Sequence, residues 1–177
     1  GITSKMIDTP RIKMHVLLSG NEGAAPVIFI NGNASSATFW EETMLKLLPS
    51  FRGIALDLRG YGDTEDKLID ATRGLRDWAD DILALTLTLG LKKFHLVGHS
   101  LGGMLMFTLA PLAGDSLVSV TLVDPGSPYG FGGTKDVNGT PCYDDFAGSG
   151  GGVVNPDFPK LIAAQDRSSD NPQASPR

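Results

Sequence analysis

The pentapeptide Gly98–Gly102, with the sequence Gly-His-Ser-Leu-Gly, holds a serine between two glycines in the pattern Gly-x-Ser-x-Gly. The apolar run Phe94–Val97 comes directly before it, and an amphipathic pattern that predicts a helix begins at Leu101. A strand, a sharp turn and a helix in this order lift a serine hydroxyl into a pocket above the sheet. Glycines are needed because side chains beside the serine would collide with the neighbouring strand or helix. The sequence therefore predicts Ser100 as a catalytic nucleophile.

Attack by Ser100 on a carbonyl would create a negatively charged oxygen, which preorganised hydrogen-bond donors can stabilise. The N–H of Leu101 is one candidate donor, because it lies at the positive end of the predicted helix. The loop Asn31–Ser36 follows the apolar run Val27–Ile30 and consists of small residues. We assign the backbone N–H of Asn33 as the second donor; an ordinary helix-capping loop is the alternative.

Five short apolar and β-branched runs, each bounded by Gly, Pro, Asn or Asp, predict strands over Ile12–Leu18, Val27–Ile30, Ile54–Leu58, Phe94–Val97 and Leu117–Val123. Several are continuously apolar, as in a parallel strand that helices bury on both faces. Between them, apolar stripes at helical spacing begin at Trp40, Leu75 and Leu101. On the second helix, Asp77, Asp80 and Asp81 are expected on the solvent face. This alternation predicts a doubly wound α/β architecture with ligands at the carboxyl ends of the strands.

Three segments carry a resemblance to a known superfamily. The loop Asn31–Ser36, the segment Leu56–Thr64 and the turn Gly98–Gly103 occur in the order typical of α/β-hydrolase esterases, and the resemblance covers about residues 12–124. It implies the mostly parallel sheet of the α/β-hydrolase fold, an acyl-enzyme on Ser100, and neither a cofactor nor a metal. Many members have His-Gly where this chain has Asn31-Gly32, so fine specificity can differ. Asp57–Thr64 is interpreted as a structural turn.

The proton-transfer half of such a site is missing from the chain. In this fold the nucleophile is followed by an acid and then by a histidine, whereas His15, His95 and His99 all precede Ser100. The resemblance also implies two strands after Leu117–Val123, for which the chain has no candidate. We therefore expect about the first two thirds of an enzyme, inactive alone, with the remaining C-terminal part supplied elsewhere. The acid is Asp124 or a residue outside the chain.

The character of the sequence changes after Pro125. We predict a hydrolase core over residues 1–125 and a glycine-rich, partly flexible segment over 126–177 that begins the cap of the active site. The stretch Gly126–Gly152 contains four aromatic residues that are candidates for an acyl pocket or for fixing the loop: Tyr129, Phe131, Tyr143 and Phe146.

Composition excludes several other functions. With 41% hydrophobic and 20% charged residues the chain is typical of a globular protein, and its net charge of −5 with scattered Lys and Arg argues against a nucleic-acid partner. The longest apolar stretch is too short to cross a membrane. Since Cys142 is the single cysteine, no internal disulfide is possible, and the cytoplasm is the default compartment. His95 and His99 do not form a helical metal site.

The predicted function is hydrolysis of small or medium carboxylic esters. An acyl-homoserine lactonase is the alternative, because the Asn31–Ser36 loop also resembles that of lactonases in this superfamily. The same loop resembles that of haloalkane dehalogenases, but those use an aspartate nucleophile, so Ser100 argues against that activity. A different class of function is a non-catalytic receptor that binds a small ligand on this fold.

Overall fold

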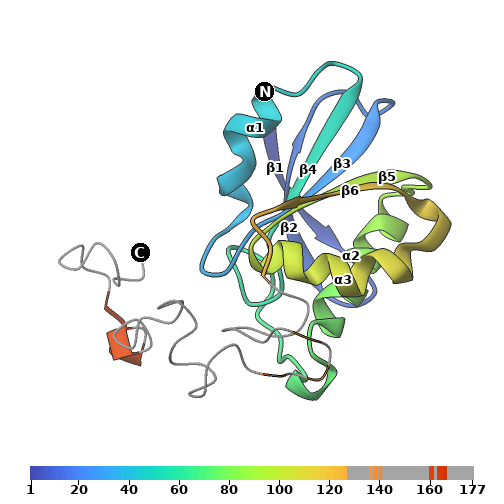
Figure 1. The fold of residues 1–177 in the computed structure, drawn as a ribbon. Coiled ribbons are helices and arrows are strands. Elements are labelled where there is room, and N and C mark those ends of the chain that lie inside the picture. Colours follow the sequence, from blue (N-terminus) through green and yellow to red (C-terminus); the bar gives the residue numbers. More distant parts are fainter. Residues whose placement is uncertain (127–135, 137, 139, 141–159, 162, 167–177) are drawn as a thin grey trace. The chain divides into compact units, whose positions relative to one another are not determined.

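In the computed structural model of this chain, six strands form one sheet in the spatial order β1-β2-β4-β3-β5-β6 (Figure 1). The strands are β1 (Ile2–Asp8), β2 (Lys13–Ser19), β3 (Ala25–Ile30), β4 (Phe51–Leu56), β5 (Phe94–His99) and β6 (Leu117–Val123). β1 pairs antiparallel with β2, and β2 antiparallel with β4, whereas β4, β3, β5 and β6 are parallel. The predicted α/β fold with a mostly parallel sheet is confirmed.

The structure describes residues 1–126, 136, 138, 140, 160, 161 and 163–166. By its internal contacts the chain divides into two units, Gly1–Pro125 and Gly126–Arg177. All six strands belong to the first unit. In the second, the Asp136 carboxylate accepts hydrogen bonds from the N–H groups of Asn138 and Thr140 at 2.9 and 3.1 Å.

Helices cover both faces of the sheet (Figure 1). A 3₁₀ turn, η1 (Ala37–Trp40), and the short helix α1 (Glu41–Leu45) pack on one face. The helices α2 (Arg76–Thr88) and α3 (Leu101–Ala113) pack on the other. The first helix is shorter than its apolar stripe predicts and ends at Leu45. Pro49 has no N–H to bond to the Leu45 carbonyl, and its ring would clash with that carbonyl in a continued helix.

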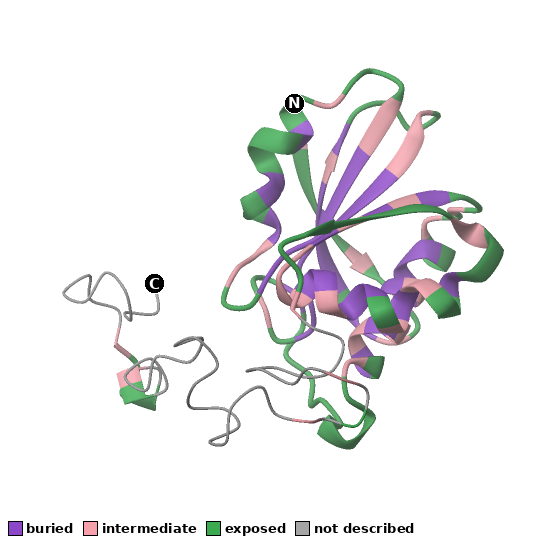
Figure 2. Ribbon diagram, in the orientation of Figure 1, coloured by how far each residue is buried: buried purple, intermediate pink, exposed green. Residues whose placement is uncertain are grey.

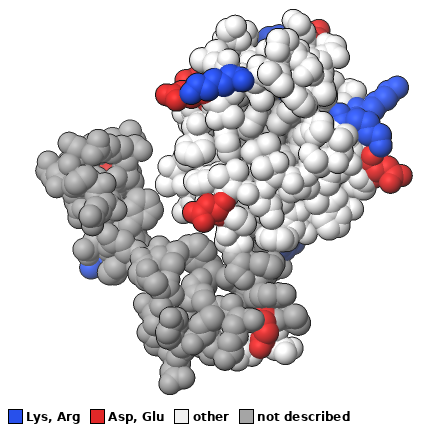
Figure 3. All heavy atoms as spheres, turned by 45° about the horizontal axis from the view of Figure 1, so that its top comes forward, with Lys and Arg blue, Asp and Glu red and all other residues white. Residues whose placement is uncertain are grey.

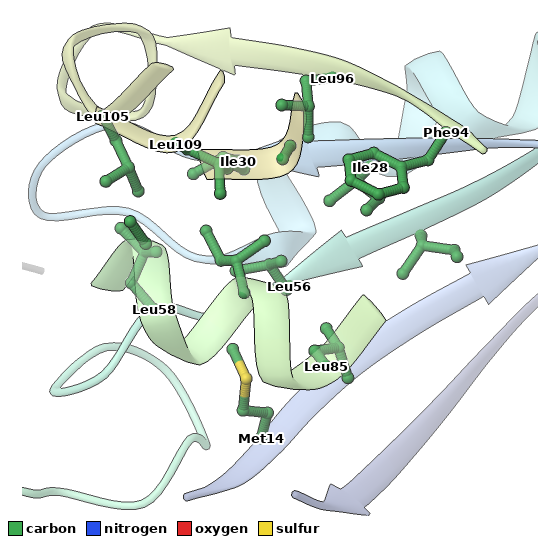
Figure 4. Packing of buried hydrophobic residues seen from close by; sticks show 14 of the residues in the cluster. Met14, Ile28, Ile30, Leu56, Leu58, Leu85, Phe94, Leu96, Leu105 and Leu109 are labelled. Atoms are coloured by element: carbon green, nitrogen blue, oxygen red, sulfur yellow. The ribbon is translucent and has the colours of Figure 1, made fainter. Parts of the chain in front are cut away.

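The central strands are buried on both faces, which explains their unbroken apolar runs (Figure 2). Towards α2 and α3, the packed side chains include Met14, Ile28, Leu56 and Leu105 (Figure 4). A second cluster around Phe29, Trp40 and Met44 fills the space under η1 and α1. Together the two clusters hold the carboxyl ends of β3, β4 and β5 in fixed positions.

The two outer strands of the described sheet differ from the centre. β1 was not predicted, because most of its residues are polar or exposed and show no apolar pattern. β6 is predicted correctly from its apolar residues, yet it lies at the sheet edge and leaves Val118 53% exposed, with Val120 and Leu122 also exposed. An apolar strand of this kind is suited to burial under further structure.

The prediction that Asp77 and Asp81 face solvent is wrong: they are only 5% and 1% exposed. The guanidinium of Arg59, in the turn after β4, donates two hydrogen bonds of 2.8 Å to the Asp81 carboxylate. The two hydrogen bonds to Asp81 raise the pKa of Arg59. Arg11 donates a third hydrogen bond to Asp81, also at 2.8 Å. Helical spacing alone cannot reveal arginines that arrive from distant turns.

A smaller ion-pair group lies at the start of α2. Burial raises the pKa of Asp80, but hydrogen bonds from Arg76 (2.7 Å) and Arg73 (2.8 Å) outweigh it and hold the pKa below the ordinary value of 3.8. A carboxylate whose pKa is lowered on folding stabilises the fold above its unfolded-state pKa, and this contribution is lost as the pH falls through the folded value.

The variant Asp80→Asn is therefore expected to lower the free energy of unfolding at pH 7 by less than about 1 kcal/mol, because both arginines are solvent-exposed. The difference from the unmodified protein should shrink at about pH 3, where the unfolded carboxyl is protonated. Urea unfolding at both pH values measures it. A difference that stays the same at pH 3 would contradict this account.

The charged side chains on the face shown in Figure 3 are scattered, and no basic patch gathers there. In the part of the chain that the structure describes, no helix is long and apolar enough to cross a bilayer. The same residues contain no group of three or more His, Cys, Asp or Glu side chains placed to hold a metal ion.

Candidate active site

Ser100 lies between the last residue of β5 and the first residue of α3, with φ 50° and ψ −113°. Positive φ is uncommon for a residue with a side chain and persists only where neighbouring structure enforces it. Here the Ser100 N–H donates to the Val123 carbonyl at 3.0 Å, and the Ser100 carbonyl accepts from the Met104 N–H at 2.9 Å. The partly exposed hydroxyl makes no hydrogen bond to any described residue. It is therefore available to a substrate.

The glycines around Ser100 allow backbone segments to pass very close together. A Cβ at Gly98 would lie 2.5 Å from the carbonyl oxygen of Gly102, and one at Gly102 would lie 2.5 Å from the carbonyl oxygen of Ile30. A Cβ at Gly103 would lie 2.8 Å from Pro125 Cβ. These approaches give the physical reason for the Gly-x-Ser-x-Gly pattern, since α3 can reach β3 only without side chains there.

The variant Gly102→Ala is expected to lower the free energy of unfolding by about 2 kcal/mol, because its methyl group would meet the rigid backbone of β3. It should also displace Ser100. Thermal unfolding measures the change, with Gly23→Ala as the matched control because a Cβ at Gly23 meets nothing within 4 Å. Equal melting temperatures for the two variants would contradict the proposed clash.

The loop Asn31–Ser36 follows β3 and lies against Ser100. Gly32 is buried there, and a Cβ on it would come within 3.1 Å of Ser100 Cβ. Asn31 is fully buried, and its Nδ2 donates to the carbonyls of Gly32 at 3.1 Å and Ser35 at 2.8 Å. Asn31 thus shapes the loop from within, at the position where the resemblance expects a histidine.

Each predicted oxyanion donor directly follows, in sequence, one of the two residues in the contact between Gly32 and Ser100. Leu101 is the first residue of α3, so its N–H has no acceptor within the helix. Asn33 directly follows Gly32, and its N–H has no acceptor among the described residues. Both N–H groups therefore remain free for a ligand. That Leu101 and Asn33 bind an oxyanion stays a prediction.

None of the three histidines hydrogen-bonds to Ser100. His99 stacks on Phe39, with ring centroids 4.8 Å apart, and its Nδ1 is buried without a partner among the described residues. His95 Nδ1 is 2.8 Å from Ser119 Oγ. His15 lies on β2, three strand spacings or about 14 Å from β5. In the described part of the chain, Ser100 has no histidine as its base.

A pairing that was not predicted joins His15 to Asp57. The His15 Nδ1 lies 2.7 Å from Asp57 Oδ2, and the His15 Nε2 lies 2.8 Å from the hydroxyl of Ser4. These are the distances of a Ser-His-Asp array, but Ser4 sits on the exposed edge strand β1, and both Asp57 oxygens also accept backbone hydrogen bonds. We interpret the array as a structural link between β1, β2 and β4. It depends on the antiparallel register of β2 and β4, which no sequence pattern reveals.

Asp124 immediately follows β6, exposed and with φ 45°. The preceding carbonyl, that of Val123, accepts the Ser100 N–H, so Asp124 begins its loop beside Ser100. Its role as the acid stays a prediction. The proposed acyl-pocket aromatics Tyr129, Phe131, Tyr143 and Phe146 lie outside the described residues.

Residues 25–141 match the protein family described as alpha/beta hydrolase fold. The chain belongs to this family. It is 36% identical over 126 residues to "Probable lysophospholipase BODYGUARD 1" of Arabidopsis thaliana, an alignment that covers 68% of this chain and 26% of that protein. It is 34% identical over 127 residues to the 2-(acetamidomethylene)succinate hydrolase of Mesorhizobium japonicum, covering 71% of this chain and 44% of the relative.

Among solved structures, an epoxide hydrolase of Vigna radiata superposes with a TM-score of 0.63 at 29% identity, covering 68% of this chain and 39% of that one. The chain thus spans between about a quarter and less than half of these relatives. Their names refer to hydrolysis of different substrates. Membership of the alpha/beta hydrolase family therefore does not specify which bond this protein cleaves.

Proposed function

We propose that the protein is a carboxylic-ester hydrolase that works through an acyl-enzyme on Ser100. The observation that carries the proposal is the unbonded Ser100 hydroxyl at a left-handed backbone position, with the Gly32 backbone against it. Ser100 Oγ attacks the carbonyl carbon, and the N–H groups of Leu101 and Asn33 stabilise the anionic oxygen. Collapse of this intermediate expels the alcohol, which takes up the serine proton, and water then releases the carboxylic acid.

The general base in this proposal is a histidine from outside the 177-residue chain. Two observations support it: the described residues offer Ser100 no histidine partner, and β6 exposes apolar residues suited to burial under further structure. The acid is Asp124 or another residue outside the chain. The 177-residue chain by itself should then be inactive, because the serine proton has no acceptor.

Two findings support an ester as substrate. A lysophospholipid, to which the name of the Arabidopsis thaliana relative refers, contains a carboxylic ester. In addition, a lactone is a cyclic ester and is opened by the same attack, and the Asn31–Ser36 loop resembles that of lactonases. An acyl-homoserine lactonase is therefore the second candidate.

A fluorophosphonate probe and p-nitrophenyl butyrate test the proposal on the complete protein. We expect covalent labelling of Ser100, identified by peptide mass spectrometry, and release of p-nitrophenol above the buffer rate. If neither occurs, the enzyme proposal fails and a ligand-binding protein on this fold becomes the better explanation.

Rates of acid release in a pH-stat distinguish the two candidate substrates. The complete protein would be given p-nitrophenyl butyrate and an acyl-homoserine lactone of the same acyl length. An ester hydrolase should show the higher kcat/KM for the ester. Lactone opening no faster than in buffer would eliminate the lactonase.

A further inference from the structure

We infer that Tyr61 is a positioning residue of the reaction: its hydroxyl, together with the carboxylate of Asp57, holds the loop Asn31–Ser36 in place beside Ser100. The inference rests on the proposed function, because it assigns a role to the loop that carries the proposed donor Asn33. Tyr61 and Asp57 both belong to the turn after β4, which sequence patterns explain only as a structural turn.

The first contact joins the turn to the exposed part of the loop. The hydroxyl of Tyr61 donates a hydrogen bond of 2.7 Å to Asn33 Oδ1. It is the one hydrogen bond of the Asn33 side chain within the described residues, and both Asn33 and the following Ala34 are solvent-exposed. Burial raises the pKa of Tyr61, so the phenol stays protonated and able to donate at neutral pH. Asn31 bonds to the carbonyls of Gly32 and Ser35 on either side, but no other hydrogen bond to Asn33 or Ala34 is present among the described residues.

The second contact fixes the far end of the same loop. Ala37, the residue after Ser36, donates its N–H to Asp57 Oδ1 at 2.6 Å. Asp57 is only 2% exposed, and its other oxygen accepts from the Asp63 N–H at 2.9 Å. Since β3 fixes the beginning of the loop, the turn completes the support by contacting its middle and its end.

The turn itself is firmly held, so it can serve as a support. The Trp78 Nε1 donates to the Arg59 carbonyl at 3.0 Å, and the Arg59 guanidinium is paired with the buried Asp81 of α2. The Trp78 ring also packs edge-on against Tyr61, with centroids 6.2 Å apart. A Cβ at Gly62 would lie 2.0 Å from Asp57 Oδ2, so the turn closes tightly around the carboxylate.

Small displacements of this loop matter for catalysis. Oxyanion donors act only when they are held within about 0.5 Å of the productive position, and a misplacement of about 1 Å can cost about 100-fold in rate. The Asn33 N–H has its position set by the loop backbone. Tyr61 would therefore affect the chemical step through Asn33, without touching the substrate.

The variant Tyr61→Phe removes the hydroxyl and keeps the ring against Trp78. On the complete protein with p-nitrophenyl butyrate, we expect kcat to fall about tenfold and KM to stay within about twofold. The loss in kcat is smaller than the roughly 10²–10³-fold caused by removing an oxyanion donor, because here the donor is displaced and not removed. The ¹⁵N order parameters of Asn33 and Ala34 should fall from about 0.85 towards 0.6. Thr88→Val, which removes a hydroxyl bonded to the Ala84 carbonyl in α2, is the matched control and should change neither quantity.

A double-mutant cycle with Asn33→Ala separates positioning from a general loss of stability. If Tyr61 acts through the Asn33 side chain, the double variant should be no slower than Asn33→Ala alone. A kcat of Tyr61→Phe within twofold of the unmodified protein would overturn the inference, as would losses that simply multiply in the double variant. If the unmodified protein neither hydrolyses esters nor labels at Ser100, the proposed function fails. In that case the ¹⁵N order parameters of Asn33 and Ala34 test the positioning role of Tyr61 by themselves. Order parameters that are the same in Tyr61→Phe and in the unmodified protein would overturn that role.

Discussion

Replacing Ser100 with alanine is expected to lower kcat/KM of the complete protein for p-nitrophenyl butyrate by about 10⁴- to 10⁶-fold. The variant should keep the fold and the N–H groups of Leu101 and Asn33 that we propose as donors, but it has no oxygen to form the proposed acyl-enzyme. The residual rate would come from those donors and from substrate binding alone. Steady-state rates and fluorophosphonate labelling, read by peptide mass spectrometry, measure the effect.

Ser50→Ala is a suitable control. Ser50 is exposed, immediately precedes β4 at the opposite end of the strands, and its hydroxyl has no hydrogen-bond partner among the described residues. Its activity should equal that of the unmodified protein. Retention of more than about 1% of activity in Ser100→Ala would contradict the assignment. Labelling of Ser4 in place of Ser100 would instead identify the Ser4-His15-Asp57 array as the reactive one.

Replacing Asp57 with asparagine is expected to lower the free energy of unfolding by about 3 kcal/mol, the largest stability loss predicted for this chain. The carboxylate accepts from the N–H groups of Ala37 and Asp63 and contacts His15, all in a buried site. In asparagine, one of the two acceptor oxygens is replaced by an NH₂ group, which donates hydrogen bonds. Whichever way the amide is oriented, the N–H of Ala37 or that of Asp63 would therefore face this NH₂ group and lose its acceptor. A domain of this size should melt about 6 to 12 °C lower.

Asp63→Asn is the matched control because Asp63 lies in the same turn, with its side chain exposed and without a partner among the described residues. That variant should unfold within about 0.5 kcal/mol of the unmodified protein. Urea unfolding gives the free energies, and circular dichroism checks that both variants retain the fold. If the two variants are equally stable, Asp57 does not organise the turn and the loop as described.

The central part of the fold was predictable because burial on both faces leaves a plain signal. β3, β4 and β5 read as short apolar runs, and the stripes beginning at Leu75 and Leu101 predict α2 and α3 closely. β1 escaped prediction because an exposed edge strand needs no apolar pattern; it is held by backbone pairing to β2. The helical pattern misplaces Asp81 because Arg11 and Arg59, which pair with it, come from other parts of the chain. Asp77 pairs with Arg11 as well as with Arg73, which lies four residues before it.

The candidate site likewise has some features that the sequence predicts and others that depend on the tertiary structure. By itself, the sequence determined the position of Ser100 in the fold, since a strand, two close glycines and a helix start are all local features of residues 94–103. Only the tertiary structure decided which distant groups surround it. The register of β2 and β4 brings His15 to Asp57 instead of to Ser100, and the turn after β4 brings Tyr61 to Asn33. Such pairings depend on the relative positions of strands and turns, which no local spacing of residue types encodes.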